Sequence, residues 1–118
     1  MKQAIKKVIE EYHPTDVVIE DILPEDVRSN QKTFKALIYL QAALAFLCHD
    51  YKLTPTLYTA SHWRAQVGIH TGRGVKRETL KAASIKLVEE NYGLKVNDDV
   101  ADAVNIGFAY YKENGSAF

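Results

Sequence analysis

The residues Thr15-Asp16-Val17-Val18-Ile19-Glu20-Asp21 are the strongest indication of the fold class of this chain. Its apolar run is too short for a helix and is rich in β-branched residues, so it predicts a buried strand that ends at Glu20 or Asp21. Side chains alternate along a strand, which puts Glu20 on the face of Val18 and Asp21 on the other face. Open α/β sheets form their sites at the carboxyl ends of the strands, so Glu20 is well placed for chemistry. The alternative is that an acid at a strand end simply begins a solvated loop.

The apolar periodicity predicts a helix on either side of this strand. Residues 2–12 form a short amphipathic helix, which His13-Pro14 ends. Residues 23–29 form a polar connection, and residues 31–51 form a long helix that is apolar around most of its circumference. We expect this long helix to be buried against a sheet or against a partner.

One more strand is expected after the long helix. Residues 56–59 predict it, and Ser61 is placed to cap a short turn of helix that contains Trp63 and Arg64. Three of the six glycines fall within residues 68–74, which therefore form a loop.

The last part of the chain predicts two helices. The first covers residues 76–92, with Gly93 as its left-handed C-cap, and the second covers residues 99–111, capped by Asn97 or Asp98 and followed by a frayed tail. Strands separated by helices favour parallel pairing. The fold class is therefore α/β, with a short, largely parallel sheet flanked by helices in a single domain over residues 1–118.

Composition limits the function. Fifteen Lys and Arg residues balance fifteen Asp and Glu residues, so affinity for a polyanion must come from local clusters of charge. The single cysteine, Cys48, excludes an intramolecular disulfide and a thiolate-rich metal site, and we expect it to pack in the core. No apolar run has the length of a signal-peptide core or a membrane span, which predicts a cytoplasmic protein without a membrane partner.

Two aspartates near the start of the last helix are candidate metal ligands. Asp99 and Asp102 are three residues apart, which puts their side chains on one helix face, within reach of one ion or of two ions about 4 Å apart. Helix capping is the alternative, because acids in the first turn complement the helix dipole. Capping explains Asp102 less well, since apolar residues follow it and an uncompensated buried carboxylate is expensive.

A basic stretch at residues 62–81 is a candidate nucleic-acid surface. It contains a single acid, Glu78, and glycines that allow close backbone approach. The alternative is a solvated loop with ordinary helix-surface charges. Trp63 and Tyr58 suit stacking on a base, but core packing is the more common role of such aromatic residues. The candidate phosphate contacts are Arg64, Arg73, Lys76, Arg77 and Lys81.

Several of these motifs together resemble the RuvC-type Holliday-junction resolvases of the ribonuclease H-like superfamily. They are residues 17–21, Asn30 with Lys32-Thr33, and Asp99-Val100-Ala101-Asp102-Ala103, supported by residues 58–64 and 68–76. The resemblance covers nearly the whole chain. It implies a truncated ribonuclease H-like fold and an endonuclease, dependent on Mg²⁺ or Mn²⁺, that cleaves branched DNA such as four-way junctions and acts as a homodimer.

By this resemblance, Glu20, Asp99 and Asp102 correspond to the family's second, third and fourth acidic ligands. The family's first aspartate lies on an opening strand without a counterpart here, so we expect the domain to be N-terminally incomplete. Three ligands without the carboxylate that bridges two ions should bind metal weakly. The alternative function is a catalytically inactive DNA-binding or dimerisation module derived from such a nuclease. A third reading is an α/β interaction domain whose acids only cap helices.

Overall fold

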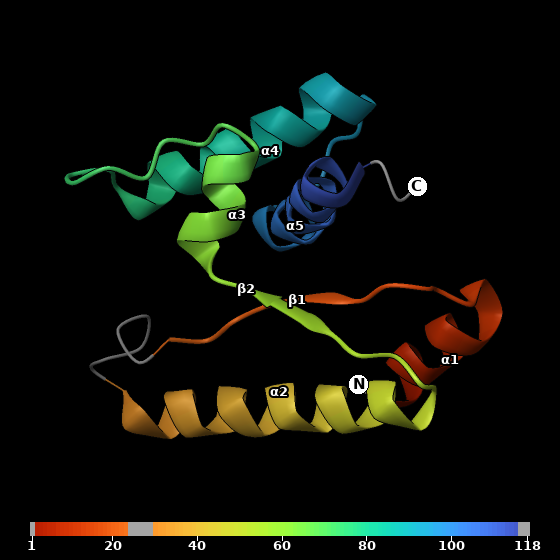
Figure 1. The fold of residues 1–118 in the computed structure, drawn as a ribbon. Helices are drawn as coiled ribbons and strands as arrows, with labels where there is room; N and C mark the ends of the chain where they lie inside the picture. The colour runs from red at the N-terminus through yellow and green to blue at the C-terminus, as the bar shows by residue number, and fades with distance from the viewer. Residues whose placement is uncertain (1, 24–29, 116–118) are drawn as a thin grey trace. The chain divides into compact units, whose positions relative to one another are not determined.

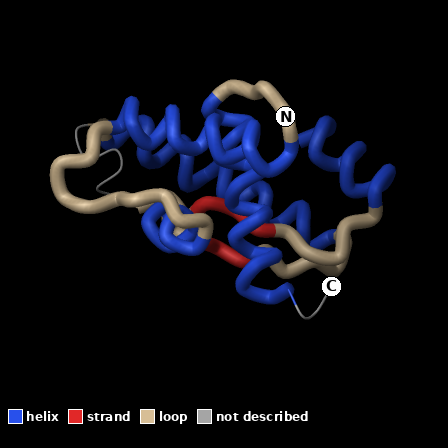
Figure 2. Tube along the Cα trace, turned by 90° about the horizontal axis from the view of Figure 1, so that it is seen from above, coloured by secondary structure: helices blue, strands red, loops and turns tan. Residues whose placement is uncertain are grey.

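The computed structural model describes residues 2–23 and 30–115, and helices account for about two thirds of them (Figures 1 and 2). Strands β1 and β2 form a two-stranded parallel sheet, so the prediction of an α/β chain with parallel pairing is confirmed. In chain order the elements are α1 (Lys2–Tyr12), β1 (Val18–Glu20), α2 (Gln31–Asp50), β2 (Thr56–Tyr58), α3 (Ala60–Gln66), α4 (Arg77–Tyr92) and α5 (Asp98–Asn114).

The described chain divides into two compact units, residues 1–57 (unit 1) and residues 58–118 (unit 2). The single domain expected from the sequence stays a prediction. Of the polar connection expected at residues 23–29, all but Leu23 lies outside the described residues.

Unit 1 contains α1, β1 and α2. The backbone amide of Thr56 donates to the carbonyl of Val17 at 2.9 Å, which joins the strand region to the segment after α2. On α2, Leu47 and Cys48 are buried, so the core role predicted for Cys48 is confirmed. Much of α2 is not buried, however, and Tyr39 is 73% exposed. Contacts within the described chain therefore do not bury α2 to the extent that the sequence predicts.

Four helices of the described chain are followed within two residues by a residue in the left-handed region, and α2 and α4 have different residues there. Gly93 has φ 68° after α4, as predicted, whereas Lys52 has φ 62° just after α2. The amide of Lys52 donates to the carbonyl of His49, and that of Leu53 to the carbonyl of Cys48, both at 2.9 Å, which close the end of α2. A side chain in this region costs about 1 kcal/mol that glycine avoids.

We therefore expect opposite effects of substitution at these two positions. Lys52→Gly should raise the free energy of unfolding by about 0.5–1 kcal/mol, and Gly93→Ala should lower it by about 1 kcal/mol. A Cβ at Gly93 meets no atom within 4 Å, so backbone strain alone sets the second effect. Urea denaturation followed by circular dichroism measures both. If the free energy of unfolding rose in both variants or fell in both, the left-handed backbone would not explain the effects.

Unit 2 is built around α5, which packs against both α3 and α4 (Figure 1). Trp63 of α3, Val88 of α4 and Ala101 of α5 are completely buried. The core role favoured for Trp63 is thus confirmed. Asn97 caps α5 as predicted, because its side chain accepts a hydrogen bond from the amide of Val100 at 2.9 Å.

Two predicted helix ends in unit 2 are wrong. Thr59, not Ser61, caps α3, and its hydroxyl oxygen accepts from the amide of His62 at 3.2 Å. Helix α5 continues past residue 111 to Asn114. The longer helix has a physical reason, because its last turn is held by hydrogen bonds from Tyr58 and His62 to Glu113.

Candidate functional site

Three acids lie in the first two turns of α5, and each has a different environment. Asp98 forms an ion pair with Lys81 of α4, with 3.7 Å between the amine nitrogen and the carboxylate oxygen. Asp99 is exposed, and Asp102 is half-buried. The predicted ligands Asp99 and Asp102 thus lie on one helix, and their neighbour Asp98 is paired with Lys81 of α4.

The carboxylate of Asp102 is held by a chain of hydrogen bonds between α4 and α5. The hydroxyl of Ser84 donates to Asp102 Oδ1 at 2.7 Å. The amide nitrogen of Asn105 donates to Ser84 Oγ at 2.8 Å and to the carbonyl oxygen of Ser84 at 3.1 Å. The sequence reasoning missed both residues. Asn105 did leave a signal, because it is a polar residue in the middle of the apolar run that follows Asp102.

This hydrogen bonding changes the interpretation of Asp102. The sequence argument treated a carboxylate on this helix face as uncompensated, and that expectation is wrong because Ser84 satisfies one of its oxygens. Helix capping does not describe Asp102 either, since its partner belongs to another helix. The contact between α4 and α5 thus includes a half-buried carboxylate with a hydroxyl donor from the other helix.

Glu20, the third predicted ligand, is the last residue of β1 and is exposed. It belongs to unit 1, whereas Asp99 and Asp102 belong to unit 2, and the structure does not fix its position relative to them. Within residues 2–23 and 30–115, no three His, Cys, Asp or Glu side chains form a group that could hold a metal ion.

The predicted phosphate contacts all lie in unit 2 and fall into two groups. Arg73, Lys76 and Arg77 are exposed in the loop before α4 and at the start of that helix. By contrast, the guanidinium carbon of Arg64 lies 5.2 Å from the ring centroid of Trp63, and Lys81 is paired with Asp98. Three of the five cations are therefore presented to solvent, and two already contact groups of the chain.

In the loop before α4, Gly72 lies against the side chain of His70. A Cβ at Gly72 would lie 2.6 Å from Nε2 of His70, so the imidazole ring of His70 occupies the room that a side chain would need. His70 itself is exposed. His70 belongs to the same loop as Arg73.

Another polar cluster that the sequence reasoning missed joins the start of unit 2 to the end of α5. Tyr58 donates to Glu113, and His62 Nε2 lies 3.2 Å from the same carboxylate oxygen. Burial and the hydrogen bond to Glu113 raise the pKa of Tyr58 to about 12. The hydrogen bonds from Tyr58 and then from His62 lower the pKa of Glu113. Because that pKa is lowered, the stabilisation by this contact is present at neutral pH and is lost as acid protonates the folded Glu113.

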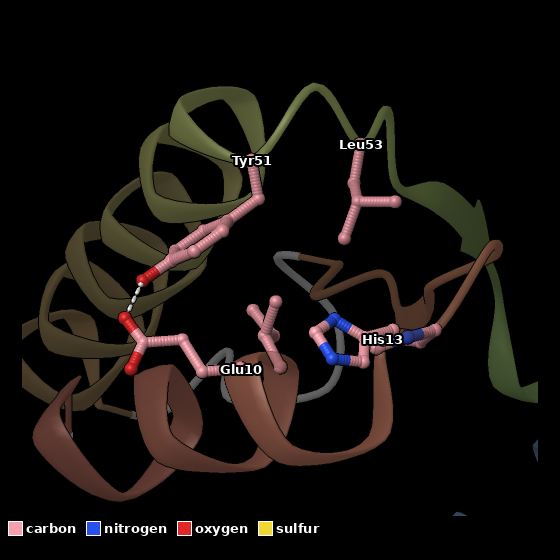
Figure 3. A pocket seen from close by; sticks show the side chains of 6 residues that line it. Glu10, His13, Tyr51 and Leu53 are labelled. Atoms are coloured by element: carbon pink, nitrogen blue, oxygen red, sulfur yellow. Dashed lines mark hydrogen bonds between the residues drawn. The ribbon is translucent and has the colours of Figure 1, made fainter.

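A pocket of about 350 Å³ lies in unit 1 beside the ends of α1 and α2 (Figure 3). The hydroxyl of Tyr51 donates to Glu10 across it at 2.6 Å, and this hydrogen bond is the main cause that raises the pKa of Tyr51 to about 12. His13 and Leu53 line the pocket as well. Since the phenol and the carboxylate satisfy each other, this pair ties the two helix ends together.

None of the helices in the described part of the chain combines the length and the hydropathy needed to cross a bilayer. Comparison with models of protein families finds no match, and neither a curated protein nor a solved structure is similar enough to match this chain.

Proposed function

We propose that this chain is a RuvC-like, ribonuclease H-type homologue of the Holliday-junction resolvases, with a site for metal-dependent cleavage of branched DNA. The observation that carries the proposal is the pair Asp99 and Asp102 on α5, where Ser84 of a neighbouring helix holds the second carboxylate. Two further features support it. Strands β1 and β2 are parallel and are connected through α2, and Glu20 is the last residue of β1.

The chemistry of the three proposed ligands suits a hard divalent cation. Glu20, Asp99 and Asp102 offer carboxylate oxygens, which Mg²⁺ and Mn²⁺ prefer over nitrogen and sulfur ligands. A bound ion supplies activation of water and stabilisation of charge on the phosphodiester. Asp99 is exposed and free to turn toward an ion, whereas Asp102 is already oriented by Ser84. In this proposal the exposed cations Arg73, Lys76 and Arg77 hold the DNA backbone.

Cleavage of an end-labelled four-way DNA junction tests this function. We expect paired nicks in Mg²⁺ or Mn²⁺, none in EDTA, and none in a linear duplex of the same sequence. Junction binding without any metal-dependent nick would reject the nuclease and select the second candidate, a catalytically inactive DNA-binding module. The observation that favours this second candidate is the exposure of Arg73, Lys76 and Arg77, which does not depend on Glu20.

DNA binding by these cations should depend strongly on salt. Each phosphate contact contributes about 0.9 to the slope of log affinity against log salt concentration, because neutralising a phosphate releases condensed counterions. Replacing Arg73, Lys76 and Arg77 together by glutamine should therefore reduce the slope by about 2.7. Fluorescence anisotropy with a labelled junction at several salt concentrations measures it.

A matched control is available on unit 1. Lys6, Lys7 and Lys35 are exposed on α1 and α2, and their replacement by glutamine changes the net charge by the same amount. If both triple variants reduced the slope equally, net charge and not this surface would control DNA binding.

We further propose that the chain forms a homodimer through unit 1. A groove of about 380 Å³ there is lined by apolar side chains, and a second copy of the chain that packed against it would remove them from water. The groove lies between α1, β1 and α2 and is lined by Ala4, Ile5, Val8, Ile9, Pro14, Val17, Ile19, Leu44 and Cys48.

Light scattering coupled to size exclusion tests the dimer. We expect a mass of twice 13.3 kDa for the wild type, and a shift toward the single-chain mass for Val8→Glu, which puts a charge at the groove. Leu94→Glu is the control, because Leu94 is a comparably exposed apolar residue of unit 2. A wild-type chain that elutes as a monomer at all concentrations would reject this interface.

A further inference from the structure

We propose that Ser84 and Asn105 are positioning residues that aim the carboxylate of Asp102 at a divalent metal ion. Both are polar residues inside the contact between α4 and α5, with 1% and 0% of their surfaces exposed. Burying polar groups costs free energy unless they are hydrogen-bonded, so two such residues at one contact need a reason. The inference rests on the proposed metal site.

The direction of each hydrogen bond follows from the partners. Asn105 contacts the carbonyl oxygen of Ser84, which only accepts, so the amide nitrogen and not its oxygen must face Ser84. The same nitrogen donates to Ser84 Oγ at 2.8 Å. An ionised carboxylate also only accepts, so the proton of the Ser84 hydroxyl points to Asp102. The chain of donors therefore runs in one direction, from Asn105 through Ser84 to Asp102.

The hydrogen bonds from Asn105 fix the orientation of the Ser84 hydroxyl, which could otherwise rotate. A serine within a helix commonly donates to the carbonyl four residues earlier, and the two hydrogen bonds from Asn105 instead hold Ser84 toward α5. Ser84 then binds Oδ1 of Asp102, and we assign Oδ2 to the metal ion. Hydrogen bonds of this second-shell kind fix the orientation of a ligand before the ion arrives.

Packing alone does not account for Asn105. Its oxygen Oδ1 is the buried side-chain atom that lacks a hydrogen-bond partner among the described residues. An unsatisfied buried acceptor costs stability, and a leucine of similar volume would fill the same space without that cost. The amide nitrogen of Asn105 makes the hydrogen bonds of this side chain. Those bonds hold Ser84, which in turn donates to Asp102.

Titration with Mn²⁺, followed by NMR line broadening of the backbone amides of residues 98–102, tests this role directly. We expect Ser84→Ala to weaken the Mn²⁺ affinity at these amides about tenfold, the usual order for loss of a second-shell partner. Asn105→Leu should weaken it in the same direction while keeping the interior filled. Thr79→Ala is the control, because Thr79 is exposed on the same helix as Ser84.

The outcomes separate the two proposals. Broadening in the wild type with equal affinity in Ser84→Ala and Asn105→Leu would overturn the positioning role and leave the metal site in place. No broadening at residues 98–102 in the wild type would overturn both. Circular dichroism of each metal-free variant reports the structural contribution separately, so a variant that has lost its helical signal is replaced in the comparison by the other one.

Discussion

Trp63→Ala should lower the free energy of unfolding by about 3–5 kcal/mol. Trp63 is completely buried, so its removal opens a cavity of side-chain size at the contact of α3 with α5. Small domains have only about 5–15 kcal/mol of stability in total, which makes this loss a large share of it. Urea denaturation of the wild type and the variant, followed by far-ultraviolet circular dichroism, measures the change.

Tyr39→Ala provides the comparison for this experiment. Tyr39 is also a large aromatic residue, but most of its side chain is exposed on α2, so its loss should change stability by less than about 0.5 kcal/mol. Because Trp63 is the only tryptophan, its fluorescence in the wild type also reports the environment of this one residue. A loss of less than 1 kcal/mol in Trp63→Ala would mean that α3 does not contribute to the core of unit 2.

Local signals were sufficient to predict most of the elements. The apolar spacing and His13-Pro14 defined α1, and Gly93 ended α4, because each of these signals acts within a few residues of where it stands. The end of α5 could not be found in the same way. Its last turn depends on Tyr58 and His62, which are 55 and 51 residues from Glu113, and no pattern near residue 111 indicates them.

The same difference between local signals and long-range contacts applies to the candidate site. The spacing of Asp99 and Asp102 placed both on one helix correctly, since this depends only on helical geometry. The partner of Asp102 depends on which helix packs against α5, and Ser84 in the predicted helix 76–92 resembles any helical serine. The engagement of Lys81 by Asp98 was missed for the same reason, because it joins two helices that are separate in the sequence.

Glu20→Gln should reduce metal-dependent cleavage of a four-way junction by at least about 100-fold. Loss of a second-shell partner already costs up to about 100-fold in metal sites, and Glu20 is proposed to bind the ion itself. Glutamine has nearly the same size and β1 exposes this position, so the substitution removes the charge and leaves the fold intact. The rates come from single-turnover cleavage of a labelled junction at saturating protein and Mn²⁺.

Glu11→Gln is the matched control, since Glu11 is an exposed glutamate of the same unit on α1, and its cleavage rate should equal that of the wild type. Junction affinity should stay unchanged in Glu20→Gln, because Glu20 is not one of the proposed phosphate contacts. A joint loss of affinity and cleavage would assign Glu20 to DNA binding. An unchanged cleavage rate would remove Glu20 from the ligand set and leave Asp99 and Asp102 as the acids that hold the ion.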